Sequence, residues 1–138
     1  MPATDADERE IIALTARYNW ALDIAHDPEA VAGTFTRDGL FQAGSGAGGR
    51  GRDELVAYFR GSAERLRAAA GSPIRHWLDN HVVDVEKDEA SHSCYILFIA
   101  VDGPSPRLHR SGVYYDRLRR TDGRWLFAER RVVIDGAG

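Results

Sequence analysis

The chain has 138 residues, of which 43% are hydrophobic and 28% are charged, and we expect one globular domain spanning residues 1–138. Its formal net charge of −3 gives no electrostatic reason to expect a nucleic-acid partner or an anionic membrane. Cys94 is the single cysteine, which excludes a disulfide within the chain and a cysteine-rich metal site.

The N-terminal part of the chain predicts two helices. Its first ten residues, MPATDADERE, are acidic and lack the pattern of a signal peptide, so we expect a cytoplasmic protein. From Asp5 to about His26, apolar residues recur at three- and four-residue spacing, and Asp5 or Asp7 could cap the start of this helix. Pro28 suits the first turn of a second, short helix that runs to Phe35, with Asp27 as its N-cap.

The rest of the chain predicts a third helix followed by a sheet. TRDGLFQ reads as a short strand or turn, AGSGAGGRG as a flexible loop, and RDELVAYFRGSAERLRAAAG as the third helix, which ends at Gly71. Four β-branched and aromatic runs then follow between residues 74 and 134, separated by short turns that favour antiparallel neighbours. This order predicts an α+β fold in which three N-terminal helices and a long, curved, mainly antiparallel sheet enclose a conical pocket.

Two patterns suggest cofactors, and both are weak. GSGAGG matches the glycine pattern of dinucleotide-binding loops, but the acidic residue that should follow about 20 positions later falls within RLRAAAG. The five histidines lie on different predicted elements and share no short metal-binding motif. We therefore expect neither a cofactor nor a metal ion.

Polar residues on the first helix and the first long strand predict a site. Asp23 falls at the rim of the buried stripe of its helix, beside Tyr18, where a desolvated carboxylate needs a partner. Strand alternation places His76 and Asn80 on one face, which we assign to the pocket, and Trp77 on the other. A histidine that faces a carboxylate in an apolar pocket is a general-base arrangement, in which the carboxylate fixes the tautomer of the ring.

Other candidate substrate contacts lie on the third helix and the later strands. Tyr58 belongs to the apolar side of the helix, and His109 lies on a strand either face of which could supply a pocket group. Arg130 alternates in phase with Leu126, Ala128 and Val132 and is the arginine that we expect to face inward, although Arg131 shares its own face with Trp125 and Phe127. We also predict that Trp77 contacts the substrate, although strand alternation places it on the outer face.

Four stretches together resemble the SnoaL-like branch of the nuclear transport factor 2-like superfamily: LTARYNWALDIAHDPEAVAGTFTRDGLF, GRDELVAYF, RHWLDNHVVDVE and SGVYYDRLRRTDGRWLFAERRV. The resemblance implies a cone-shaped α+β barrel with a deep pocket. Within that branch, the Tyr-x-x-x-x-Asp helix and the histidine at the start of a strand are similar to the group of scytalone dehydratase, hexachlorocyclohexane dehydrochlorinase and the bile-acid dehydratases.

The resemblance implies roles for particular residues. His76 would be the base, Asp23 its partner, Tyr18 a pocket hydroxyl and Arg130 a contact for an anion or leaving group. Leu22 stands where scytalone dehydratase has a catalytic tyrosine, so Tyr18 would have to take that role. The expected activity is a cofactor-independent lyase or isomerase that acts on a hydrophobic, cyclic small molecule.

Two alternatives remain open at this point. GRWLFAERRVVID also resembles the non-catalytic small subunit of ring-hydroxylating dioxygenases, which has the same fold. A hydrolase of the limonene-epoxide type would need a second inward aspartate, and the candidates Asp79 and Asp116 are expected to face away.

An apolar outer face of the sheet, with Trp77 and Val83, predicts a homodimer or homotrimer.

Overall fold

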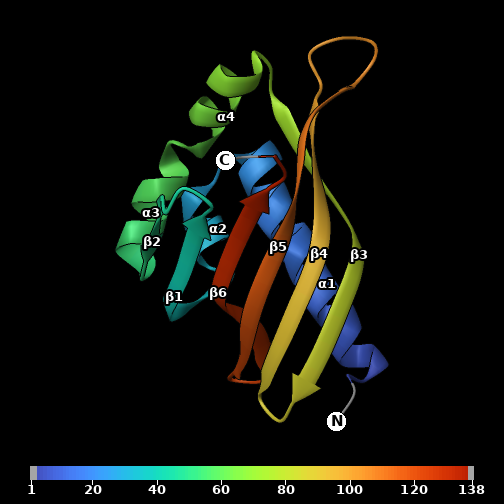
Figure 1. Ribbon diagram of the computed structural model, residues 1–138. Helices are drawn as coiled ribbons and strands as arrows, with labels where there is room; N and C mark the ends of the chain where they lie inside the picture. The colour runs from blue at the N-terminus through green and yellow to red at the C-terminus, as the bar shows by residue number, and fades with distance from the viewer. Residues whose placement is uncertain (1–2, 137–138) are drawn as a thin grey trace.

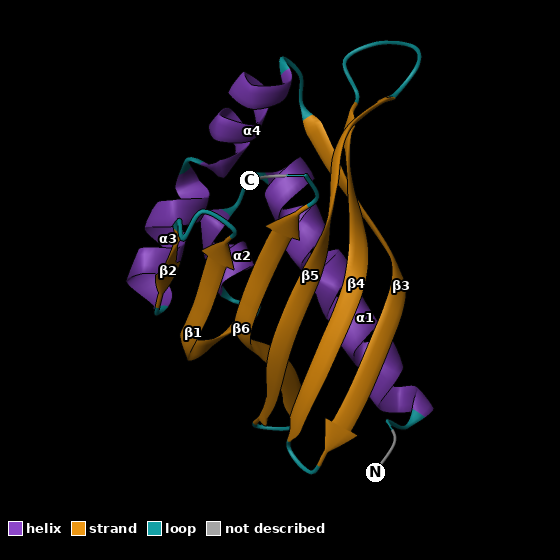
Figure 2. Ribbon diagram, in the orientation of Figure 1, coloured by secondary structure: helices purple, strands orange, loops and turns teal. Residues whose placement is uncertain are grey.

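The computed structural model describes residues 3–136 and confirms the α+β class with a curved, mainly antiparallel sheet. The helical segments are α1 (Asp5–Trp20), the π-helical turn η1 (Ala21–Ala25), α2 (Pro28–Ala32), α3 (Arg52–Arg60) and α4 (Ser62–Ala70). The strands are β1 (Phe35–Ala43), β2 (Gly48–Arg50), β3 (Ile74–Glu86), β4 (Glu89–Ala100), β5 (Arg107–Thr121) and β6 (Arg124–Ile134). Figures 1 and 2 show α1 crossing behind the long strands, with the other helices gathered beside β1.

The helix ends follow from local hydrogen bonding. Thr4, rather than Asp5 or Asp7, is the N-cap of α1: its side chain accepts a hydrogen bond from the main-chain N–H of Asp7, whose carboxylate completes a capping box. Asp27 caps α2 as predicted, with Pro28 in the first turn. The third predicted helix is divided into α3 and α4 at Gly61, and Gly71 ends α4 in the left-handed conformation.

The sheet has six strands in the order β2-β1-β6-β5-β4-β3. All neighbours are antiparallel except β1 and β6, which are parallel. The glycine-rich loop turns β1 back into β2, and Gly48 is needed there because a Cβ would overlap the carbonyl oxygen of Phe41. An antiparallel hairpin is not the strand–loop–helix unit of a dinucleotide site, which agrees with the sequence interpretation.

Three β-bulges change which side chains face inward. One lies at Asn80 and His81 in β3, where Asn80 has a φ of 57°, one at His109 in β5 and one at Ala128 in β6. Because side chains alternate with period two, one extra residue exchanges the two faces of the strand beyond it. The predicted strand phases therefore hold on one side of each bulge and fail on the other.

Aromatic residues from helices and sheet form the core between the two layers. Tyr18, Phe35, Phe59 and Phe127 are buried, and their neighbouring ring centroids lie 5.5 to 6.3 Å apart. Burial of one such side chain stabilises the fold by about 1.5–3 kcal/mol. Within residues 3–136, no helix has both the length and the apolar character needed to cross a membrane.

Candidate active site

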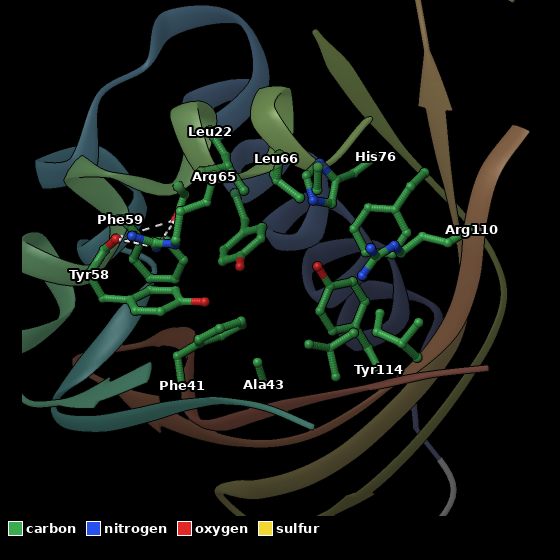
Figure 3. A pocket seen from close by; sticks show the side chains of 16 residues that line it. Leu22, Phe41, Ala43, Tyr58, Phe59, Arg65, Leu66, His76, Arg110 and Tyr114 are labelled. Carbon is green, nitrogen blue, oxygen red and sulfur yellow. Dashed lines mark hydrogen bonds between the residues drawn. The ribbon is translucent and has the colours of Figure 1, made fainter. Parts of the chain in front are cut away.

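A cavity of about 240 Å³ opens between the helices and the inner face of the sheet. Most of its wall is apolar, and Figure 3 shows the side chains that surround it. Polar groups reach it from several elements: Tyr18, Tyr58, Ser62, Arg65, His76, Arg110 and Tyr114. The volume lies slightly below the usual range of about 300–1,000 Å³ for ligand pockets, which favours a small substrate.

Asp23 and His76 form a buried pair at the wall of this cavity. Nδ1 of His76 lies 2.6 Å from Oδ1 of Asp23, and the main-chain N–H of His76 donates to Oδ2 at 2.7 Å. The carboxylate therefore accepts two hydrogen bonds from one residue, which fixes the ring orientation and places the proton on Nδ1. Since His76 also lines the cavity, Nε2 is left as a lone-pair nitrogen available to a ligand.

The π-helical turn explains how α1 can supply this carboxylate. Asp23 lies in η1, where one extra residue per turn rotates the helix face relative to a regular α-helix. His26 then ends the turn with a φ of 49° and donates its main-chain N–H to the carbonyl of Ala21. The side chain of Asp23, which the helical pattern places at the rim of the buried stripe, thus reaches the start of β3.

Two tyrosines place hydroxyl groups at the cavity wall. Tyr18 and Tyr114 are both buried, and burial raises the pKa of each phenol well above its usual value. Both hydroxyls therefore stay protonated near neutral pH and can donate a hydrogen bond to an oxygen atom of a ligand.

Arg130 faces inward, as the sequence predicts, but it lies behind the tyrosines instead of lining the cavity. Its guanidinium carbon lies 3.6 Å from the ring centroid of Tyr114 and 4.4 Å from that of Tyr18, and Nε lies 3.4 Å from Oδ1 of Asp116. The predicted contact between Arg130 and a leaving group is thus not present in this geometry. The guanidinium instead stabilises the aromatic wall through cation–π contacts.

A second buried pair lies deeper in the sheet, where Nδ1 of His92 is 2.7 Å from Oδ2 of Asp116. Asp116 was expected to face away, and this is wrong, because the residue is fully buried and faces inward. Nε2 of His92 is in turn 2.9 Å from Nδ1 of His81, which the bulge in β3 directs inward. Asp116 is hydrogen-bonded to His92, forms an ion pair with Arg130 and lies outside the cavity lining, so it does not supply the second aspartate of an epoxide-hydrolase site.

Donor atoms of His81, His92 and Cys94 all lie within 4.8 Å of one another, a set that could hold a soft divalent metal. The two histidines already satisfy each other by hydrogen bonding. Burial raises the pKa of the Cys94 thiol to about 12, so the sulfur carries its proton at neutral pH and is a poor ligand. The cluster is therefore explained as a polar network inside the sheet.

The other predicted contacts divide between the cavity and its surroundings. Tyr58 lines the cavity. Asn80 is exposed because it sits in the bulge, so its predicted inward position is wrong. Trp77 is 63% exposed on the outer face and lines a second hollow that also touches Asp23 and His76. His109 is the bulged residue of β5 and lies outside the cavity lining.

Sequence reasoning missed four polar residues of the cavity: Ser62, Arg65, Arg110 and Tyr114. Tyr114 and Arg110 lie on the face of β5 that includes Gly112 and Asp116. Strand alternation would therefore have predicted both residues if the inward face of this strand had been known. Arg65 lies on α4, and its guanidinium stacks 4.3 Å from the ring centroid of Tyr58.

Residues 4–131 match the family of SnoaL-like domains. The chain belongs to this family. Among curated protein sequences, none matches. A nuclear transport factor 2-like protein with a cystatin-like fold from Novosphingobium aromaticivorans has 28% identity and a TM-score of 0.81, covering 96% of this chain and 85% of that chain. A protein from Catenulispora acidiphila in complex with S-DNPA has 28% identity and a TM-score of 0.81, covering 96% of both chains.

A scytalone dehydratase-like protein from Novosphingobium aromaticivorans is also similar to this SnoaL-like chain in structure. It has 24% identity and a TM-score of 0.74, and the alignment covers 94% of this chain and 84% of that chain. At this identity the similarity establishes the fold alone. Together these findings show that the chain, a SnoaL-like domain, has the nuclear transport factor 2-like fold that its sequence resembles.

Proposed function

We propose that the protein is a cofactor-independent lyase or isomerase that removes a proton next to a carbonyl group of a hydrophobic, cyclic small molecule. The observation that carries this proposal is the 2.6 Å contact between Asp23 and His76 at the wall of a largely apolar cavity. A non-catalytic accessory subunit, the alternative function, has no need for such a pair. The similarity to a protein from Catenulispora acidiphila in complex with S-DNPA supports a cavity that binds a ligand.

The proposed reaction begins at Nε2 of His76. This nitrogen takes the proton from the carbon beside the carbonyl group, and the electron pair of the C–H bond forms an enolate. Asp23 stabilises the imidazolium that results. The enolate oxygen accepts a hydrogen bond from Tyr18 or Tyr114, whose hydroxyls line the same cavity.

The second step decides between elimination and isomerisation. Where the substrate has a hydroxyl on the next carbon, the enolate expels it, a C=C bond forms, and the imidazolium returns its proton to the leaving oxygen to give water. Where the substrate instead has a C=C bond between the β and γ carbons, the proton returns to the γ carbon of the dienolate and the double bond moves into conjugation with the carbonyl group. Either course restores neutral His76, so no external acid or base is consumed.

The test uses proton exchange, because this step precedes both outcomes. The protein is incubated in D₂O with 1-tetralone, and with a cyclic β-hydroxy ketone whose loss of water gives a conjugated product. NMR measures deuterium at the carbon beside the carbonyl, and ultraviolet absorbance measures the conjugated product. We expect exchange with wild type and its loss in His76→Ala and Asp23→Asn, with folding verified by circular dichroism.

His26→Asn is the matched control, since His26 is exposed and asparagine tolerates its left-handed backbone. It should keep wild-type exchange. Exchange at the wild-type rate in both His76→Ala and Asp23→Asn would show that the pair is not the base. A wild-type protein inert toward all such ketones would favour the accessory-subunit alternative.

We also propose that the chain forms a homodimer or homotrimer through the outer face of the sheet. Trp77 lies opposite Leu97, and Tyr95 continues this surface through Val113 to Val133. Exposed apolar side chains this close together are typical of a contact surface. Light scattering during gel filtration should give a mass above the 15.3 kDa of one chain and a lower mass for Leu97→Lys.

A further inference from the structure

Arg110 lies in the same row of the sheet as His76. His76 on β3 is opposite Phe98 on β4, and Phe98 is opposite Arg110 on β5. Neighbouring strands are about 4.8 Å apart, so the backbones of His76 and Arg110 are roughly 10 Å from each other. Figure 3 shows the guanidinium of Arg110 directed into the cavity, toward the space between His76 and Tyr114. One small ligand can therefore contact both side chains.

The charged side chains that line the cavity are all positive. Arg65 and Arg110 both line it, whereas no Asp or Glu among residues 3–136 does. Arg65 is held in place, because Nη2 donates to the carbonyl of Tyr58 at 2.7 Å and to Oγ of Ser62 at 3.0 Å. Asp23, behind the wall, already accepts two hydrogen bonds from His76.

Neither cavity arginine has an ion-pair partner in the part of the chain that the structure describes. The guanidinium of Arg130, which lies behind the tyrosines, is balanced by Asp116. A ligand that entered this cavity would thus meet an apolar wall and two solvent-exposed guanidinium groups, of which that of Arg110 lies beside the base. Such a wall favours an anionic substituent over a neutral one.

We propose that the cavity binds hydrophobic carboxylic acids of one or two rings, with the carboxylate held by Arg110. This deepens the function proposed above and rests on the same cavity. The planar guanidinium can donate two parallel hydrogen bonds to a carboxylate, which lysine cannot do in that geometry. The carboxylate is bound and not transformed, and it sets the position of the ring relative to Nε2 of His76.

The experiment compares two ligands of nearly equal size, 2-naphthoate and 2-naphthamide, by isothermal titration calorimetry at neutral pH. We expect wild type to bind the naphthoate about tenfold more tightly, the lower end of what a hydrogen bond to a charged group supplies. Arg110→Gln should remove this preference and leave naphthamide binding unchanged. Arg117→Gln, an exposed position on the same strand, is the matched control and should behave as wild type.

Equal affinity of wild type for the two compounds, or no binding of either, would overturn the proposal. So would an Arg110→Gln variant that still prefers naphthoate. His76→Ala separates this proposal from the proposed reaction, because the variant should lose proton exchange and keep the charge preference. A wild type that prefers naphthoate but exchanges no ketone proton supports the carboxylate site and counts against the chemistry alone.

Discussion

The protein contains two buried Asp–His pairs of nearly equal geometry, and they differ in what the second ring nitrogen meets. In both pairs Nδ1 contacts a carboxylate oxygen, at 2.6 Å for His76 and Asp23 and at 2.7 Å for His92 and Asp116. Nε2 of His92 is hydrogen-bonded to Nδ1 of His81, whereas the ring of His76 lines the cavity and leaves Nε2 available to a ligand. The same pair of residues can thus do chemistry in one place and stabilise the fold in another.

The surroundings of the two carboxylates differ as well. Asp116 is the counter-ion of Arg130, whose guanidinium is fully buried and has no hydrogen-bond partner among the described residues. Asp23 has no arginine partner there and binds only His76. Removal of each carboxylate should therefore reveal whether its main effect is on reactivity or on stability.

The largest expected difference between the pairs is in reactivity. His76→Ala should lower the rate of proton exchange about 10²–10⁴-fold, because this is what a positioned general base contributes. Its free energy of unfolding should change far less than this rate. The measurement is the NMR exchange assay in parallel with urea unfolding, and a rate loss explained entirely by unfolded protein would contradict the assignment.

The second difference is in stability. Asp116→Asn should lower the free energy of unfolding by about 3–5 kcal/mol, since it leaves the buried charge of Arg130 without a counter-ion. Asp23→Asn should cost about 1–2 kcal/mol, because the amide oxygen can still accept a hydrogen bond from His76. Urea unfolding measures both values.

A double variant sharpens this second comparison. Asp116→Asn combined with Arg130→Met removes the charge together with its partner, and should recover part of the lost stability. A double variant less stable than Asp116→Asn alone would mean that Arg130 stabilises the fold mainly through its aromatic contacts.

A smaller effect is expected at the tyrosines. Tyr114→Phe removes a hydroxyl from the cavity and keeps the ring that stacks on Arg130, so the exchange rate should fall about tenfold, the equivalent of one hydrogen bond, with stability nearly unchanged. Tyr115→Phe, at an exposed position on the same strand, should leave the rate unchanged. Equal effects of both variants would exclude a specific role for Tyr114.

The smallest effect concerns pH. Burial lowers the pKa of His81 below its ordinary 6.5, so below about pH 6.5 the unfolded chain binds a proton there that the folded chain does not. Stability should therefore be fully present above this pH and decline as the pH falls through the lowered value. Urea unfolding between about pH 7.5 and 5 should show a shallower decline in His81→Gln. An unchanged slope would mean that other groups cause the decline.

Much of the site followed from local sequence. Helical spacing put Tyr18 on the buried stripe and Asp23 at its rim, and alternation near the start of β3 put His76 inward, before any bulge intervenes. These predictions depend only on periodicity over a few residues, and that is why they hold. The order of helices and short-turned strands likewise determined the α+β class and the curved sheet.

Tertiary structure decided the rest through the three bulges and the π-helical turn. The bulge at Ala128 lets Phe127 and Arg130 both face inward, although strict alternation forces a choice between them. The bulge in β3 turns Asn80 outward and His81 inward, and the π turn brings Asp23 within 2.6 Å of a histidine 53 residues away. One inserted residue inverts every side chain beyond it, and whether it forms depends on the neighbouring strand and the packing it permits, which no stretch of sequence contains alone.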